Sequence, residues 1–226
     1  FAVVDARLLA RKPLNLSPRE AASLPLILVT AWEGLVDRAR MSAGHKVLIH
    51  GGAGGVGHVA VQLARAFGAE VYATGSAGQR SIIEGYGATF IDYRESSVEN
   101  YVAEFTAGEG FDIVYDTVGG DTLDASFKAA RIYSGHVLSC LGWGQHSLAP
   151  LSFRGATYSG VFTLLPLLTG RGCEHHGEIL RQAAALIESG QLRPMLDPHR
   201  FTLETAGEAH ELLAAKAAQG RVVVEI

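Results

Sequence analysis

Short apolar runs alternate with helix-like stretches through the middle of the chain. Six runs each predict a buried β-strand: 46–50, 70–74, 89–92, 111–115, 136–141 and 156–162. Amphipathic or capped segments predict the helices: about 29–40, 56–67, 79–86, 96–105, 121–130, 178–189 and 206–218. Strands that read as continuous apolar runs are typical of a parallel sheet covered on both faces. We therefore predict an α/β fold with a doubly wound parallel Rossmann sheet and helices on both faces.

The two ends of the chain carry shorter signals. Residues 1–5 predict the end of a strand, and 17–20 read Ser-Pro-Arg-Glu, a capping box with proline at the first helical position. Near the other end, 200–203 and 221–226 predict extended segments. Because the sequence starts at Phe1, without Met and in mid-pattern, we expect it to be a fragment of a longer protein.

A glycine-rich turn lies between the first predicted strand and the helix that follows it. Residues 52–57 read Gly-Ala-Gly-Gly-Val-Gly, the G-x-G-x-x-G pattern of dinucleotide-binding turns. In this interpretation Gly52 permits the tight turn, Gly54 lets the backbone approach a diphosphate, and Gly57 lets the helix lie close to the strand. The N–H groups and the dipole of the helix N-terminus then hold the anion. The βα units that follow in order favour dinucleotide binding over an ordinary glycine-rich turn.

The end of the second predicted strand bears on which dinucleotide is bound. NAD sites place a carboxylate there to hold the ribose 2′-hydroxyl, but the chain has no carboxylate between Glu70 and Glu84. Arg80 and the Ser76 hydroxyl stand in that segment and suit a 2′-phosphate. The competing interpretation makes Arg80 a solvated helix residue. We expect NADP(H) as the cofactor, with NAD less favoured.

Composition excludes several classes of protein. Of 226 residues, 48% are apolar and 19% charged, which indicates a folded chain rather than a disordered one. The net charge of −4 and the lack of a basic block argue against nucleic acid or a membrane surface as partner. The longest apolar stretches are too short to span a bilayer. Cys140 and Cys173 form no CxxC pair and no disulfide framework, so we expect a reducing, cytoplasmic setting.

Four stretches, taken together, are more specific than the glycine turn alone: LPLILVTAWEGL, HGGAGGVGHVAVQLARAFGAEVYATGS, FDIVYDTVGG and the ending GRVVVEI. They resemble the zinc-independent quinone oxidoreductases of the medium-chain dehydrogenase/reductase superfamily, which is zinc-type alcohol dehydrogenase-like. The resemblance implies a Rossmann domain that binds NADPH and a GroES-like catalytic domain, most of which would be missing here. We expect 1–25 to end the catalytic domain, 26–165 to form the Rossmann NADP-binding domain, and 166–226 to form the last Rossmann helix and the return to the catalytic domain.

The resemblance also implies roles for individual residues. Thr30 would lie beside the nicotinamide as the catalytic-site residue, while Ser76 and Tyr93 would hold the 2′-phosphate end. The family's usual lysine after the second strand is absent, and Gln79 or Arg80 stands there. The residues that we expect to bind the cofactor, several of them around its diphosphate, are Gly52, Ala53, Gly54, Gly55, Val56, Gly57, Ser76, Arg80, Tyr93, Val118 and Leu141.

We expect no metal site in this chain. Zinc-dependent relatives place a Cys or Asp ligand in the segment that corresponds to 21–30, which here offers no thiolate, imidazole or carboxylate. Residues 173–176, Cys-Glu-His-His, are the one metal-like cluster, and we interpret them as a polar surface loop before a helix. His50 is interpreted as a packed histidine, and Asp116 as the residue that orders the loop 117–120.

Without a metal, the chemistry falls to the nicotinamide. The expected activity is hydride transfer from NADPH to a quinone or an α,β-unsaturated carbonyl, with hydrogen-bond donors stabilising the developing oxyanion. Two alternatives stay open: an enoyl-reductase module of a polyketide synthase, and a non-catalytic NADP-binding protein. The expected partner is a small-molecule substrate. Relatives commonly dimerise through the edge strand of the sheet, which leaves a homodimer as an option.

Overall fold

The computed structural model describes residues 3–226, which divide into two compact units. One unit is continuous and comprises Thr30–Thr163, and the other joins Phe1–Val29 to Leu164–Ile226. The strand predicted over 1–5 is not formed by residues 3–5, and residues 1–2 lie outside the described residues. Assigning the discontinuous unit to a GroES-like domain stays a prediction.

A six-stranded parallel sheet forms the centre of the continuous unit. Its strands are β1 (Lys46–Ile49), β2 (Glu70–Gly75), β3 (Thr89–Asp92), β4 (Ile113–Asp116), β5 (His136–Ser139) and β6 (Thr157–Gly160). Their order is β3-β2-β1-β4-β5-β6, and in the central strand Leu48 pairs with both Tyr72 and Val114. This is the doubly wound order, so the predicted Rossmann sheet is confirmed. The strand order reverses between β1 and β4, and in such sheets ligands bind outside the carboxyl ends of the strands at that point.

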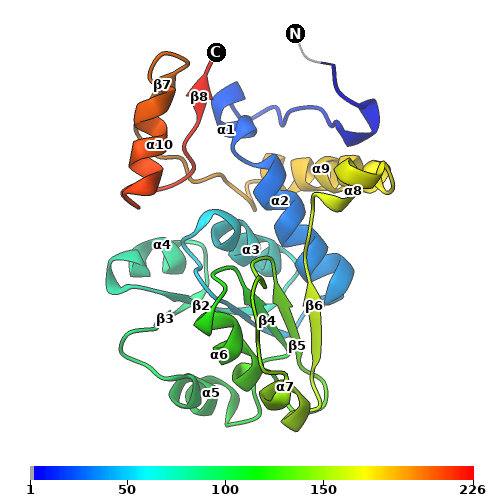
Figure 1. Cartoon of the computed structure of the whole chain (residues 1–226), viewed down its shortest axis with the longest axis vertical. Helices are drawn as coiled ribbons and strands as arrows, with labels where there is room; N and C mark the ends of the chain where they lie inside the picture. Colours follow the sequence, from blue (N-terminus) through cyan, green and yellow to red (C-terminus); the bar gives the residue numbers. More distant parts are fainter. Residues whose placement is uncertain (1–2) are drawn as a thin grey trace. The chain divides into compact units, whose positions relative to one another are not determined.

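Helices cover both faces of this sheet (Figure 1). They are α3 (Gly55–Ala66), η3 (Ala77–Gln79), α4 (Arg80–Gly85), α5 (Val98–Thr106), α6 (Asp121–Ala129) and α7 (Ala149–Phe153). Figure 1 shows α3 and α4 on one face, and α5, α6 and α7 on the other. On the second face Phe111, Val114 and Phe127 are fully buried. Helix α7 was not predicted, because its five residues are too few to show a helical period.

The helix predicted over 29–40 begins earlier and changes type along its length. Helix α2 (Pro25–Trp32) starts at a proline, which suits a first helical turn, and continues as the π-helix η2 (Glu33–Arg38). In η2 the Ala39 N–H reaches the Gly34 carbonyl oxygen at 3.0 Å, five residues back. The side of η2 at Gly34 lies against the ring of Tyr115. The change from α-helix to π-helix thus occurs where the helix packs against Tyr115, and no local sequence pattern predicts it.

The discontinuous unit is mainly helical. It contains η1 (Ala6–Leu8), α1 (Pro18–Ala22), α8 (Leu165–Thr169), α9 (Cys173–Glu188), α10 (Ala206–Ala214) and the parallel pair β7 (Phe201–Thr202) and β8 (Val224–Glu225). The predicted capping box is confirmed, since Ser17 caps α1 and Glu20 returns the bond. The buried Asp197 carboxylate accepts from the Gln219 N–H at 2.8 Å and the His199 N–H at 2.9 Å, which ties the tail to the preceding loop.

Several predicted boundaries need correction at the edges of elements. The fourth strand begins at Ile113, because Phe111 makes only an isolated bridge to Ala130. Of the extended segment predicted over 221–226, only β8 forms a strand. Helix α9 begins at Cys173, five residues before the predicted start. Within residues 3–226, no helix combines the length and the apolar character that a bilayer span requires.

Candidate functional site

The glycine turn connects the end of β1 to the start of α3. Gly51 adopts a left-handed backbone conformation with φ of 72°, and its carbonyl oxygen accepts from the Gly54 N–H at 2.8 Å. Gly54 is then the N-cap of α3, and no side chain of the described residues caps this helix. The N–H groups at the start of a twelve-residue helix therefore stand without a side-chain acceptor, which is the arrangement that binds an anion.

Two glycines of the turn, Gly52 and Gly57, have no room for a side chain, and Gly54 has little. A Cβ on Gly57 would lie 2.0 Å from the Gly51 carbonyl oxygen, and one on Gly52 would lie 2.6 Å from the Ala73 Cβ. A Cβ on Gly54 would meet the Gly51 oxygen at 3.0 Å, which is tight but not prohibitive. The left-handed residue of the turn is Gly51, while the absence of a Cβ on Gly52 leaves room for Ala73 of β2.

A cavity of about 490 Å³ opens beside this turn. Its walls come from the turn after β1, the end of β2, the loops after β3 and β4, and the helices α5 and α6. The lining residues are His50, Gly51, Thr74, Gly75, Gln79, Tyr93, Ser96, Ser97, Val98, Glu99, Tyr101, Val118, Thr122, Ala125 and Lys128. The volume is in the range of a site for a small molecule or part of a cofactor.

His50 and Thr74 lie buried between the turn and the sheet. The Thr74 hydroxyl lies 3.2 Å from His50 Nδ1 and accepts from the Gly51 N–H at 3.1 Å, while the Thr74 carbonyl accepts from the Gly52 N–H at 2.9 Å. Burial lowers the pKa of His50 to about 4, against a smaller opposing effect of Asp116, so the imidazole is neutral near pH 7. The packed role predicted for His50 agrees with its burial.

The Asp116 side chain is hydrogen-bonded to the loop that follows β4. Its buried carboxyl accepts from the N–H groups of Val118 and Gly119 at 3.0 and 2.9 Å, and from the Ser139 hydroxyl at 2.7 Å. The Ser139 hydroxyl accepts in turn from the Leu141 N–H at 3.1 Å. The predicted role of Asp116 in ordering the loop 117–120 is therefore confirmed, and the same network reaches Leu141.

The structure brings some of the predicted cofactor residues to the cavity and leaves others beside it. Tyr93 and Val118 line the cavity and are about half exposed. Ser76 stands next to it, where its N–H donates to Gln79 Oε1 at 3.0 Å. Arg80 does not line the cavity: its guanidinium lies 3.1 Å from a Glu84 carboxylate oxygen and over the Phe90 ring. The remaining predicted residues of the turn, 52–57, and Leu141 are not among the lining residues either.

Thr30 lies in α2 and is buried. Its carbonyl oxygen accepts a hydrogen bond from the Tyr115 hydroxyl at 2.7 Å. The backbone of Thr30 is thus fixed to β4, while its place beside a nicotinamide stays a prediction.

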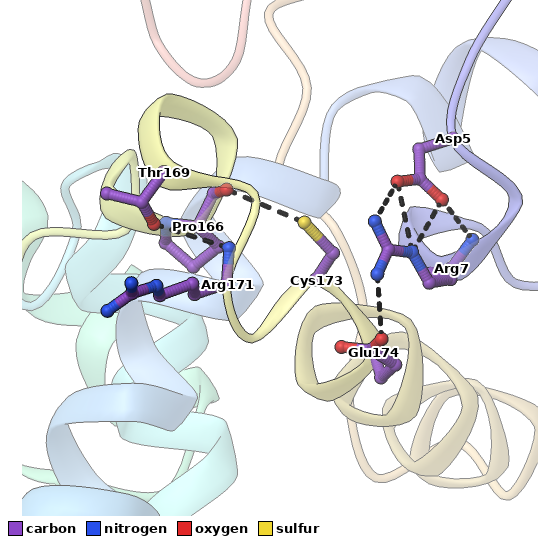
Figure 2. Close-up of polar contacts among 7 residues, drawn as sticks. All are labelled: Asp5, Arg7, Pro166, Thr169, Arg171, Cys173 and Glu174. Carbon is purple, nitrogen blue, oxygen red and sulfur yellow. Dashed lines mark hydrogen bonds and ion pairs between the residues drawn. The ribbon is translucent and has the colours of Figure 1, made fainter.

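The metal-like run 173–176 makes structural contacts within its own unit. These residues form the first turn of α9 and not the predicted loop; the Cys173 thiol donates to the Pro166 carbonyl oxygen at 3.5 Å, and Glu174 pairs with Arg7 at 2.9 Å (Figure 2). Arg7 also binds Asp5, which holds the N-terminal segment against α9. Among residues 3–226, no cluster of three or more His, Cys, Asp or Glu side chains has the geometry to hold a metal ion.

Sequence reasoning missed the wall of the cavity that α5 and α6 provide. Glu99 and Lys128 lie on α5 and α6 and reach the cavity from elements distant in sequence, so no local motif marks them. Thr74 did carry a signal, because it is a hydroxyl residue near the end of a strand whose middle, 71–73, is apolar.

Comparison with known proteins connects this site to one family. Residues 86–224 match the family model described as zinc-binding dehydrogenase. Among solved structures, an alcohol dehydrogenase superfamily protein from Novosphingobium aromaticivorans is 52% identical, with a TM-score of 0.95, and the match covers 99% of this chain and 68% of that chain.

Two curated relatives extend the comparison. The 2-methylene-furan-3-one reductase of Solanum lycopersicum is 34% identical over 99% of this chain, and the spectinabilin polyketide synthase system protein NorB of Streptomyces orinoci is 36% identical over 99%. The chain spans 51% of the first relative and 10% of the second.

Proposed function

The chain belongs to the zinc-binding dehydrogenase family of the medium-chain dehydrogenase/reductase superfamily, and on that premise we propose that it binds NADPH for hydride transfer to an α,β-unsaturated carbonyl or a quinone. One observation carries the proposal: the uncapped N-terminus of α3 and the tight glycine turn stand beside a cavity at the switch point of the sheet. The backbone there suits a diphosphate.

The end of β2 supports NADPH over NADH. This strand ends at Gly75, and neither its last residues, 71–75, nor the following η3 offers a carboxylate that would repel a 2′-phosphate. Tyr93 lines the cavity and its N–H donates to the Gly75 carbonyl oxygen at 3.3 Å, and Arg80 is the first residue of α4. Arg80 must leave Glu84 to reach a phosphate, and an exposed ion pair resists that change by only about 0.2–1 kcal/mol.

The residues of this chain fit NADP(H) better than zinc. The glycine turn stands beside the cavity, which Gly51 lines, and it carries no Cβ at Gly54, while no cluster in residues 3–226 offers a set of metal ligands. When bound, the nicotinamide supplies the hydride. The chain's own part is to hold the diphosphate on the α3 N–H groups, to order the loop after β4 through Asp116, and to fix the Thr30 backbone through Tyr115.

The names of the two curated relatives indicate which class of molecule could accept the hydride. The named substrate of the Solanum lycopersicum reductase is an α,β-unsaturated ketone, which supports an enone as the class of substrate. The match to NorB supports a second candidate, the enoyl-reductase module of a polyketide synthase, whose substrate is an α,β-unsaturated thioester. Both reactions add hydride to a conjugated carbonyl, so the site described here serves either one.

The test separates binding from turnover. NADPH is titrated into the chain by fluorescence, with Gly54→Val as the matched variant, which is expected to stay folded and to lose binding. Oxidation of NADPH is then followed by absorbance in the full-length natural polypeptide with 1,4-naphthoquinone, an enone and an enoyl thioester. Preference among the three acceptors identifies the reaction. Tight binding with no oxidation favours the non-catalytic alternative, and absence of NADPH binding contradicts the proposal.

A further inference from the structure

The first two amides of the glycine turn bind to a single residue of the neighbouring strand. Thr74 accepts from the Gly51 N–H through its hydroxyl oxygen, at 3.1 Å, and from the Gly52 N–H through its carbonyl oxygen, at 2.9 Å. The carbonyl bond depends only on the backbone of β2. The hydroxyl bond is specific to the side chain, and it acts on the one left-handed residue of the turn.

His50 determines where the Thr74 hydroxyl points. That hydroxyl has one proton, and its second partner besides the Gly51 N–H is His50 Nδ1, at 3.2 Å. When the imidazole hydrogen is on Nε2, Nδ1 accepts the hydroxyl proton while the hydroxyl oxygen accepts from the Gly51 N–H, so both bonds are made at once. The neutral imidazole is the only form that offers an acceptor at Nδ1, and burial keeps it neutral by lowering its pKa to about 4.

The other end of the imidazole is left without a partner. His50 Nε2 is buried and makes no hydrogen bond in the described structure. An unsatisfied buried polar group is costly, and an apolar side chain of similar shape would avoid that cost. A histidine is therefore a poor choice for stability at this position, whereas its Nδ1 atom has a definite role in the turn.

From this geometry we infer that His50 and Thr74 form a positioning pair, which holds Gly51 in the shape that lets the turn receive a diphosphate. The inference rests on the proposed binding of NADPH. The Gly51 carbonyl oxygen accepts from the Gly54 N–H at 2.8 Å, so a shift of Gly51 is passed directly to the N-cap of α3. The pair acts through the backbone of the turn and is not itself catalytic.

The test compares a ligand that has a diphosphate with one that lacks it. NADPH and adenosine 2′-monophosphate share the 2′-phosphate, but only NADPH reaches the turn with a diphosphate. Thr74→Val removes the acceptor for Gly51 at nearly constant volume. It is expected to weaken NADPH binding about tenfold, the weight of one hydrogen bond, and to change the affinity for adenosine 2′-monophosphate by less than about twofold. Thr74→Ser keeps the hydroxyl and is expected to keep NADPH affinity.

Two variants of His50 separate positioning from stability. Asn places a polar atom near the position of Nδ1 and nothing at Nε2, so His50→Asn is expected to keep NADPH affinity. His50→Leu removes Nδ1 and is expected to weaken NADPH binding like Thr74→Val without a matching fall in melting temperature. The Thr74→Val/His50→Leu double variant is expected to bind NADPH no worse than Thr74→Val alone, because the two side chains act in series.

Amide exchange of Gly51 gives a readout independent of ligand. Exchange of this N–H, followed by NMR, is expected to accelerate in Thr74→Val and His50→Leu and to stay slow in His50→Asn. Equal losses of affinity for both ligands, or unchanged Gly51 exchange in Thr74→Val, would overturn the positioning pair while NADPH binding by the natural chain stands. If the natural chain does not bind NADPH, the proposed function fails first, and the positioning role fails with it.

Discussion

The Tyr115 hydroxyl donates a hydrogen bond to the Thr30 carbonyl oxygen across 2.7 Å, and so joins the central sheet to the helix that opens the continuous unit. The same ring fills the space beside Gly34, where a Cβ would lie 2.8 Å from two of its carbon atoms. Tyr115 thus serves both as a core side chain and as the anchor of the segment in which α2 becomes η2.

Tyr115→Phe tests the anchor without disturbing the packing. The ring is kept and one buried hydrogen bond is lost, so the free energy of unfolding is expected to fall by about 1 kcal/mol. Urea denaturation followed by circular dichroism measures the change. Tyr133→Phe is the matched control, because Tyr133 is exposed, and its stability should equal that of the natural chain. A Tyr115→Phe protein as stable as that control would contradict the anchoring role.

Gly57 is expected to tolerate no side chain. In Gly57→Ala the new methyl group would meet the Gly51 carbonyl oxygen at 2.0 Å, and this backbone atom moves only if the turn moves. We expect a loss of stability of about 1–3 kcal/mol, or more, and loss of NADPH binding. Gly85→Ala is the control: it lies in α4 with nothing within 4 Å, so alanine should raise stability by about 0.5–1 kcal/mol.

Arg80 is the test of cofactor preference. Arg80→Ala is expected to weaken NADPH binding by about tenfold or more, in line with the loss of a charge-assisted hydrogen bond, and to leave NADH binding nearly unchanged. Calorimetric titration of both dinucleotides measures the difference. Arg94→Ala removes a nearby exposed arginine that lies over the Tyr93 ring and serves as the comparison. Equal losses for the two cofactors in Arg80→Ala would remove Arg80 from the site, and a selective loss of NADPH in Arg94→Ala would transfer the role to Arg94.

Stability should depend on pH through His50. Its pKa is lowered in the folded state from 6.5 to about 4, chiefly by burial, so between these values the unfolded chain binds more protons than the folded one. The free energy of unfolding is therefore complete above about pH 6.5 and declines as the pH falls toward 4, by about 3 kcal/mol. Burial also lowers the pKa of His136, which adds a contribution of the same sign.

The His50 contribution is isolated by comparing variants at each pH. His50→Asn cannot be protonated there, so its stability should fall less than that of the natural chain between pH 6.5 and 4, while the contribution of His136 stays in both proteins. Denaturant titrations across this range give the two curves. Parallel curves would show that His50 does not titrate differently in the folded and unfolded states.

Two variants of Asp116 test whether its hydrogen bonds, and not only its volume, stabilise the loop 117–120. Its carboxyl accepts two backbone N–H groups and the Ser139 hydroxyl, and Asn can keep the backbone bonds while its amide donates to the Ser139 oxygen. Asp116→Asn should therefore cost less than about 1.5 kcal/mol. Asp116→Ala removes the acceptor of all three donors, of which the Ser139 hydroxyl is buried, and should cost about 3 kcal/mol. Equal stabilities of the two variants would show that this network does not order the loop 117–120.

Much of the architecture could be predicted because its signals are local. Apolar runs such as 46–50 and 70–74 mark buried parallel strands, and the amphipathic stretch 56–67 marks the helix after the turn; all three are present as β1, β2 and α3. The family was recognised from the same stretches, and the comparisons confirm it. Short elements such as α7 and α8 were missed, since five residues do not display a period.

The sequence by itself determined the order of strands and helices, the doubly wound sheet and the position of the glycine turn. Hydrophobic periodicity and glycine spacing are local patterns that can be identified in the sequence alone. Only the tertiary structure decided that Gly51, not Gly52, is the left-handed residue, that α2 becomes a π-helix beside Tyr115, and that Thr74 holds the turn. These features depend on contacts between neighbouring strands and distant helices. Such contacts exist only once the sheet has assembled, so no stretch of sequence encodes them alone.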